Sequence, residues 1–434
     1  MTGGRNAHPL LISLANISME FRNKSSSNSY LLLALLPIAA FIHPSKKVRG
    51  MLDARLYHQC LDLILRPLKS AAQLGVMLSD PVGNLRWCFT PLASFIVDTP
   101  EAQLVSAAGG KSSPVTIANS KQLGDSFRHS SRTGAITLQA INTINGMPEA
   151  AQSLEKYERL AKKSHLNGVQ LPFWRDWPLS DPSIFLTSEP LHHWHRQFWD
   201  HDVKWCIYAV GDNEIDFRFS ILRVHTGYRQ FKEGISKLKQ VTGRDQRDIQ
   251  RYIIPIIADA VSPRFVLALR ALMDFRYLAQ STLLDDKVCE RISLALTLFH
   301  QNKQAITDSG ARRGKNGPIQ HWQIPKLELL FSVVPGIKSN GVASQWSADF
   351  TEHAHITLVK DPARAGNNQM YEAQICRYLD RLEKIRDFNL TTALLAQGYQ
   401  LVGLILPYKT KSNKIILAYS LQAQYPILLP FILT

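Results

Sequence analysis

The chain has 434 residues, of which 45% are hydrophobic, and carries a formal net charge of +15. This is an ordinary globular composition with enough apolar residues for a sizeable core, and the scattered excess of Lys and Arg suits a polyanionic partner. The five cysteines are far apart and form no C-x-x-C pair, which argues against a zinc ribbon or a disulfide framework and favours a reducing compartment. They are Cys60, Cys88, Cys206, Cys289 and Cys376.

The first hundred residues begin with a polar stretch, 1–29, that we expect to be disordered or a linker. The apolar run 31–42 follows; it is shorter than the roughly 20 residues of a spanning helix and is interrupted by Pro37, so we predict a buried strand and no membrane segment. Residues 48–66 carry apolar side chains at helical spacing and predict an amphipathic helix packed on the sheet. This apolar stripe comprises Leu52, Leu56, Cys60 and Leu63.

The stretch 85–101 is mostly apolar and ends in Asp98, Thr99 and Pro100. Pro91 argues against one long strand, so we place a buried, central strand at 92–97. Asp98 then lies at the carboxyl end of a strand, where ligands and metals collect in open α/β sheets. The alternative is an acid that only ends the strand in a turn.

The middle of the chain holds two unusual segments. Residues 107–130 are rich in Gly, Ser and Lys, but they lack the frame of a phosphate-binding loop. After helical residues 132–166, the segment 189–208 is rich in His and Trp; as an α-helix it would align His192 with His195 and place Asp202 on a neighbouring stripe. Such a helix is either a metal site or simply packed by its tryptophans.

Residues 217–299 have a helical period and many arginines, and residues 310–317 form a basic loop. The arginines could line up for contacts with phosphates, or they could be a solvated face. The candidate DNA-binding residues are Lys237, Lys239, Arg244, Arg247, Arg251, Arg312, Arg313 and Lys315.

Towards the end, Glu352 stands beside two histidines in the sequence TEHAH. It is either a metal-binding carboxylate or an exposed acid near a helix start. Residues 371–387 predict a charged surface helix, and residues 401–434 are apolar with no site signature.

Several long segments occur together in one order: LLLALLPIAAFIHPSKKVRG, DPVGNLRWCFTPLASFIVDTPE, LHHWHRQFWDHDVKWC, FKEGISKLKQVTGRDQRDIQRY and QWSADFTEHAHITLVK followed by ICRYLDRLEK. With these segments the chain resembles the transposases of the Plavaka group of fungal DNA transposons, relatives of the CACTA superfamily, over about residues 30–390.

The resemblance implies an α/β fold: an incomplete RNase H-like core, a mixed sheet with helices, that carries a large α-helical insertion. It also implies a nuclear protein whose partner is DNA at the transposon ends, and a site where three carboxylates hold two Mg²⁺ ions that activate water or a DNA 3′-hydroxyl. By position, Asp98 corresponds to the second carboxylate and Glu352 to the third. Asp200 and Asp202 are the runners-up for the third. Self-association is left open.

The chain also departs from this family. The family's first catalytic Asp lies on an opening strand upstream of residue 31, where we find no counterpart, and the zinc finger is missing. We therefore expect an amino-terminally truncated, inactive transposase; the alternative is a host-adopted DNA- or protein-binding adaptor. The expected division is 1–29 linker, 30–130 core, 131–340 helical insertion, 341–392 return to the core and 393–434 an apolar tail of uncertain origin.

Overall fold

The computed structural model describes residues 7–80, 84–239, 241–367, 369–398, 427–428 and 431–434. It is a mixed α/β structure around a four-stranded sheet with the order β2-β1-β9-β5. The strands are β1 (His8–Leu14), β2 (Leu31–Leu36), β5 (Leu92–Phe95) and β9 (Phe431–Leu433). Strand β1 is antiparallel to both β2 and β9, whereas β5 is parallel to β9.

Strand β1 corrects the prediction that residues 1–29 are a linker. It lies inside the sheet. Its residues Leu10 and Leu11 point to opposite faces and are 2% and 0% exposed, because both faces of the sheet are covered. The apolar run is short and surrounded by polar residues, which is why composition alone hides it. Helix α1 (Met19–Arg22) and the 3₁₀ turn η1 (Ser25–Ser27) connect it to β2.

Strand β9 gives a place in the fold to the end of the predicted apolar tail. It lies between β1 and β5, and its residues Ile432 and Leu433 are 2% and 0% exposed. Much of that tail, residues 399–426 and 429–430, lies outside the described residues. The described end of the tail is therefore part of the central sheet.

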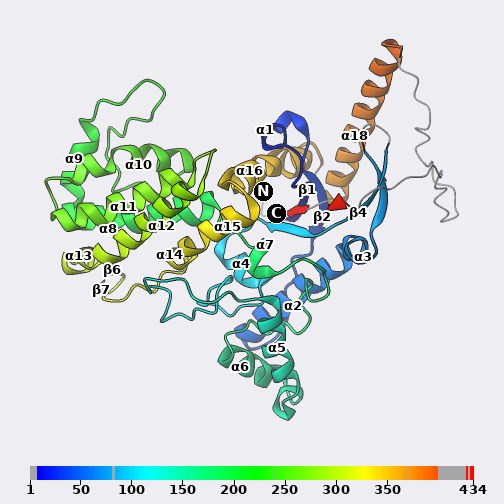
Figure 1. Ribbon diagram of the computed structural model, residues 1–434, viewed down its shortest axis with the longest axis horizontal. Helices are drawn as coiled ribbons and strands as arrows, with labels where there is room; N and C mark the ends of the chain where they lie inside the picture. Colours follow the sequence, from blue (N-terminus) through cyan, green and yellow to red (C-terminus); the bar gives the residue numbers. More distant parts are fainter. Residues whose placement is uncertain (1–6, 81–83, 240, 368, 399–426, 429–430) are drawn as a thin grey trace.

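Helices cover both faces of this sheet (Figure 1). Helices α2 (Lys46–Ile64) and α4 (Thr99–Val105) pack on the face that carries Leu10. Helix α16 (Ala348–His355) packs on the face that carries Leu11. The edge strand β2 is covered by three further helices, η7 (Ile356–Lys360), α17 (Asp361–Arg364) and α18 (Tyr371–Ala396). Most of α18 projects away from the body of the protein.

Helix α2 is confirmed, but its buried face is not the predicted one. Leu63 is 63% exposed, whereas Met51 and Leu61 are 2% and 0% exposed. The face that packs is rotated from the predicted stripe, because the helix buries Tyr57 and His58 as well as aliphatic residues.

Two strand predictions need correction. Strand β2 covers only the first part of the predicted strand 31–42, because it ends before Pro37. It is also an edge strand with alternating, partial burial instead of a buried one. Strand β5 is also at an edge of the sheet, and an isolated bridge joins its Phe95 to Leu186. A separate sheet contains β3 (Val76–Ser79), β4 (Leu85–Phe89) and β8 (Ile427–Leu428), so Pro91 does separate two strands.

A helical lobe, which includes helices α8 to α13 (residues 204–308), forms the left of Figure 1. Its core is aromatic and aliphatic: Trp194, Trp205, Phe275 and Phe299 are all at most 2% exposed. The remaining helices of the chain are α3 (Arg66–Leu74), α5 (Gly134–Asn145), η2 (Pro148–Ala151), α6 (Leu154–Lys163), α7 (Pro182–Phe185), η3 (Pro190–His195), η4 (Phe198–Val203), α8 (Lys204–Val210), α9 (Asp212–Ser220), α10 (Gly243–Ile257), α11 (Pro263–Ala279), α12 (Asp286–Asn302), α13 (Gln304–Asp308), α14 (Pro325–Leu329), η5 (Leu330–Ser332), α15 (Val333–Asn340) and η6 (Ala343–Gln345). A short ribbon of β6 (Arg313–Gly314) and β7 (Gly317–Pro318) follows α13. Among the described residues, no helix is long and apolar enough to cross a membrane.

Candidate functional site

A cavity of about 160 Å³ opens at the end of β5, and both Asp98 and Glu352 line it. Asp98 comes from the turn after β5, and Glu352 from helix α16 on the other side of the sheet. The structure therefore brings together the two acids that the sequence singles out, although more than half of the chain separates them. Their neighbours in the cavity wall are His8, Tyr57, Glu101, His192 and His355.

Asp98 is the N-cap of helix α4. Its Oδ1 accepts a hydrogen bond from the backbone N–H of Glu101 (2.9 Å), and Pro100 in the first turn suits the start of a helix. A residue that ends a strand and starts a helix needs a short polar side chain, so this role alone explains an Asp here. Its side chain is still exposed to the cavity.

Glu101 is held by residues from two other elements. His8 Nε2 on β1 lies 2.9 Å from Glu101 Oε1, and Tyr57 on α2 donates its hydroxyl to the same oxygen (2.8 Å). Burial would raise the pKa of Glu101, but the contacts with His8 and Tyr57 hold it below its usual value. The contact with Glu101 in turn raises the pKa of His8. Glu101 is therefore a fixed anion.

His192 stands between two carboxylates. Its Nδ1 lies 2.9 Å from the buried Glu189, and its Nε2 lies 3.5 Å from Glu352. Burial opposes a charge on the imidazole, but these two acids raise the pKa of His192 to about 10. The contact with His192 lowers the pKa of Glu352. At neutral pH the cavity wall thus contains an imidazolium paired with Glu352.

Glu189 fixes the relative position of η3 and α16. It is fully buried, and its Oε2 accepts hydrogen bonds from the backbone N–H groups of Leu191 (2.8 Å) and Ala348 (3.2 Å). One side chain therefore caps η3 and holds the start of α16. This arrangement sets the distance between His192 and Glu352.

Residues 190–203 contain two π-helical segments, η3 and η4, instead of the α-helix expected there. The wider turn changes which residues share a face, so His192 reaches the cavity while His193 and His195 are each 1% exposed. Asp202 is 0% exposed and pairs with Arg276 (2.7 Å) in the core of the helical lobe. Asp202 is therefore placed in the core and does not line the cavity.

The donor set does not fit the Mg²⁺ site that the resemblance implies. In the described part of the chain, no group of three or more His, Cys, Asp or Glu side chains is arranged to hold a metal ion. Asp98 is engaged in capping and Glu352 is engaged by His192, and Mg²⁺ prefers carboxylates and water to imidazoles. The histidine-rich segment does not form such a group either.

A larger cavity of about 610 Å³ adjoins the first and shares Asp98 and His192 with it. Lys111, Arg196 and Lys326 line it, and Asp200 pairs with Arg196 (2.9 Å) and lies 3.7 Å from Lys326. Arg196 and Lys326 thus share the carboxylate of Asp200, while Lys111 adds a third positive charge to the wall. The cavity therefore offers positive charge next to Asp98.

The predicted DNA-binding residues are placed unevenly. Lys237, Lys239 and Lys315 are exposed, as are Arg244, Arg251 and Arg313. Arg312 is 6% exposed and lies over the ring of Trp322 (5.6 Å), so its guanidinium is not part of the surface.

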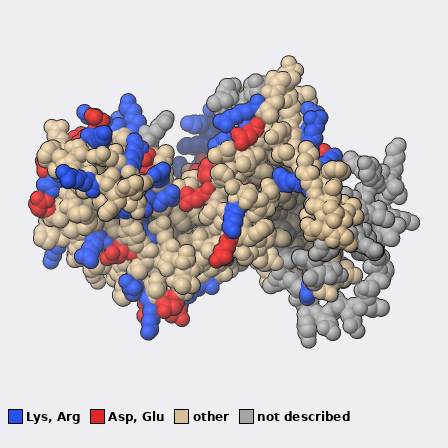
Figure 2. Space-filling view, turned by 90° about the horizontal axis from the view of Figure 1, so that it is seen from above, with Lys and Arg blue, Asp and Glu red and all other residues tan. Residues whose placement is uncertain are grey.

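On α10, the arginines have acidic partners: Arg244 and Arg251 pair with Asp248, and Arg247 with Asp349. Figure 2 shows the same mixture of charges, with acids interspersed among the basic residues of the helical lobe.

Sequence reasoning missed several residues of the site. Glu101 was missed, although it follows Asp98 by three positions, a spacing typical of a helix start that could have revealed it. His8 was hidden in the supposed linker, and the local pattern around Lys111 and Lys326 contains no sign that they meet near Asp98.

The comparisons with known proteins support part of the family resemblance. Residues 1–206 match the family model of the Plavaka transposase. A search of curated proteins found no match. The matched residues include β1, β2, β5, Asp98 and the π-helical segment with His192, whereas Glu352 lies outside them. The first 206 residues are thus similar to a Plavaka transposase.

Proposed function

We propose that this chain is a transposase-derived DNA-binding protein of the nucleus, with an RNase H-like core that does not cleave DNA. The observation that carries the proposal is the meeting of Asp98 and Glu352 in one cavity. The acids were named from the resemblance, and they come from opposite sides of the sheet, so their convergence is not a consequence of sequence proximity.

The sheet supports the RNase H-like part of the proposal. In such a sheet an opening strand, which carries the first acid, lies beside the strand that leads to the second acid. Here β9 takes that place, antiparallel to β1 and parallel to β5. Its described residues, together with Thr434 beside it, carry no acidic side chain.

The site chemistry supports the absence of cleavage. A pair of Mg²⁺ ions needs several free carboxylates, and here Glu352 is neutralised by His192 while Glu101 is held by His8 and Tyr57. We derive no reaction step through a metal at this site.

Charge supports DNA as the partner. The net charge is +15, and Lys111, Arg196 and Lys326 line the cavity next to Asp98. Contacts between such side chains and phosphates release counterions, so binding of this kind weakens steeply with salt. A protein-binding adaptor would not show this dependence on salt.

Two measurements on the full chain test the proposal. Fluorescence anisotropy with a DNA duplex at 50 and 200 mM salt should give an affinity that falls by about tenfold or more. The triple variant Lys111→Ala, Arg196→Ala, Lys326→Ala should bind more weakly and with a smaller salt slope. A matched control is the exposed set Lys384→Ala, Arg377→Ala, Arg381→Ala on α18.

A plasmid-nicking assay in Mg²⁺ or Mn²⁺ tests the second half. We expect no nicking above that of the double variant Asp98→Asn, Glu352→Gln. Nicking by the unmodified chain that disappears in this variant would overturn the proposal that the protein does not cleave DNA. Retention of DNA that does not change with salt would overturn the DNA-binding reading.

A further inference from the structure

A second cavity lies on the opposite face of helix α16. It has a volume of about 210 Å³ and is formed by the connection between β1 and β2 together with α16 and η7. Phe350 and His353 face this cavity, whereas Glu352 and His355 on the same helix face the first one. The spacing of these residues follows the helical period, so α16 is the wall between the two cavities.

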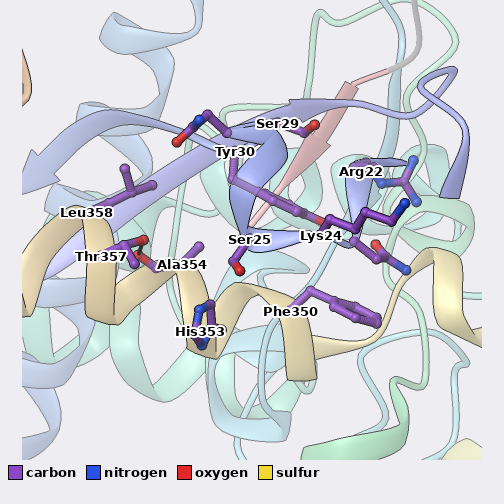
Figure 3. Close-up of a pocket in the computed structure, with 12 residues that line it drawn as sticks. Arg22, Lys24, Ser25, Ser29, Tyr30, Phe350, His353, Ala354, Thr357 and Leu358 are labelled. Atoms are coloured by element: carbon purple, nitrogen blue, oxygen red, sulfur yellow. Dashed lines mark hydrogen bonds between the residues drawn. The ribbon is translucent and has the colours of Figure 1, made fainter. Parts of the chain in front are cut away.

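Part of the wall of the second cavity is aromatic and aliphatic. Tyr30, just before β2, is 7% exposed, and Phe350 is partly buried. Figure 3 shows Tyr30 entering from the β1–β2 side and Phe350 from α16, with Ala354 and Leu358 beside them. Such rings offer flat apolar faces to a flat ligand.

Two buried polar atoms of the lining residues have no partner. The guanidinium of Arg22, which is 1% exposed, donates from Nη1 to the carbonyl of Ala15 (2.9 Å) and from Nη2 to that of Gln345 (2.9 Å), but its Nε–H is unpaired. Asn23 donates to the carbonyl of Ser344 (3.1 Å), and its Oδ1 is unpaired. Buried polar atoms are nearly always paired, so one open donor and one open acceptor point to a ligand.

The mouth of the cavity is polar and positive. Lys24, Ser25, Asn28 and His353 are exposed there. A simple anion does not explain the interior, because the terminal nitrogens of Arg22 already bind backbone carbonyls. The interior instead suits a flat group with both donors and acceptors, and the mouth suits a phosphate attached to it.

We propose that this cavity binds a single nucleobase, with Tyr30 and Phe350 against its faces, Arg22 and Asn23 at its edge, and Lys24 near the attached phosphate. An apolar cavity of about 150 Å³ holds a benzene molecule, so about 210 Å³ admits one base. The base belongs to a free nucleotide or to an unpaired position in a DNA strand. Only the second source rests on the proposed function.

Calorimetry on the full chain with dAMP, dGMP, dCMP and dTMP tests the chemistry. Phe350→Ala should weaken binding of the preferred nucleotide by about fivefold or more, since base–aromatic stacking contributes on that scale. Phe350→Tyr should restore it. The control Phe388→Ala changes an aromatic residue on α18 that is 71% exposed and lies outside the cavity, so binding should be unchanged.

Lys24→Ala provides a second variant that does not depend on core packing. It should weaken binding of the nucleoside monophosphate and leave binding of the corresponding nucleoside unchanged. No binding of any mononucleotide or of a single-stranded oligonucleotide would overturn the proposal. So would binding that is equal in Phe350→Ala and the unmodified chain.

Oligonucleotides identify the source of the base. If the base comes from DNA, a single strand with one abasic position should bind more weakly than the intact strand, and Phe350→Ala should remove this difference. If mononucleotides bind but the two strands do not differ, the ligand is a free nucleotide. Salt-dependent duplex binding is measured in parallel, so loss of that binding with mononucleotide binding intact would reject only the proposed function.

Discussion

Histidine protonation is set by the immediate surroundings of each ring in the segment 190–203. His192, between Glu189 and Glu352, has a pKa raised to about 10, whereas burial lowers the pKa of its neighbour His193 to about 4. At neutral pH the ring of His192 is therefore positively charged, and the ring of His193 is neutral. The first is part of the cavity wall, and the second is a neutral core residue with both ring nitrogens unpaired.

The second of these residues predicts a dependence of stability on acid. Because the folded-state pKa of His193 lies below its unfolded value, its contribution is present above pH 6.5 and is lost as pH falls through about 4. The loss amounts to about 3 kcal/mol. We expect His193→Leu to remove this part of the acid destabilisation, measured by urea unfolding between pH 7 and 4. The same change at His225, which is exposed, serves as the control.

The two aspartates in WDHD predict mutational effects of very different size. Asp202→Asn leaves the buried Arg276 without its counter-charge and should destabilise the protein by about 3–5 kcal/mol. Asp200→Asn changes a partly exposed pair and should cost less than about 1 kcal/mol. Thermal unfolding of both variants checks the difference. Equal stability of the two variants would contradict the buried ion pair.

At the level of elements, strand β9 is expected to be essential for the core. Leu433 is 0% exposed between β1 and β5, so Leu433→Ala should lower the free energy of unfolding by about 2–5 kcal/mol. The same change at Leu395 on α18, which is 56% exposed, should stay within about 0.5 kcal/mol. Urea unfolding midpoints of the two variants provide the comparison.

Elements with a clear local signal were predicted well, and elements defined by distant partners were not. The apolar run 31–42 located β2, and the interruption at Pro91 located β5, because proline limits strand pairing locally; Pro37 ended β2 earlier than predicted. Strand β1 was missed because its burial comes from β2 and β9. The face of α2 was misjudged because Leu63 matches the helical period yet lies outside the packed surface.

For the candidate site, the sequence indicated the acids but not their partners. Asp98 and Glu352 were named from the family resemblance, and both line one cavity in the structure. The pKa of Glu352 is lowered by His192, which Glu189 holds at a π-helical turn, and the neighbouring Glu101 is held by His8 from the strand that the sequence did not reveal. No local pattern encodes these contacts, so whether the acids are free for a metal could not be predicted from spacing.

On the scale of the whole molecule, the two faces of the sheet differ in what lies against them. The face with α2 and α4 is a conventional apolar core, whereas α16 on the other face separates two cavities with different chemistry. The helical lobe joins this arrangement through Glu189 and through the pair of Arg247 with Asp349. A shift of α16 would therefore change both cavities together.

The pairing of Ile12 with Leu433 also has a consequence for synthesis. Strand β1 is synthesised long before β9, its neighbour in the sheet. Until β9 is made, one side of β1 and the inner side of β5 remain open, which is the kind of exposed strand edge that chaperones protect and that slows folding. Nascent chains of this protein should thus stay dependent on chaperones until β9 has emerged from the ribosome.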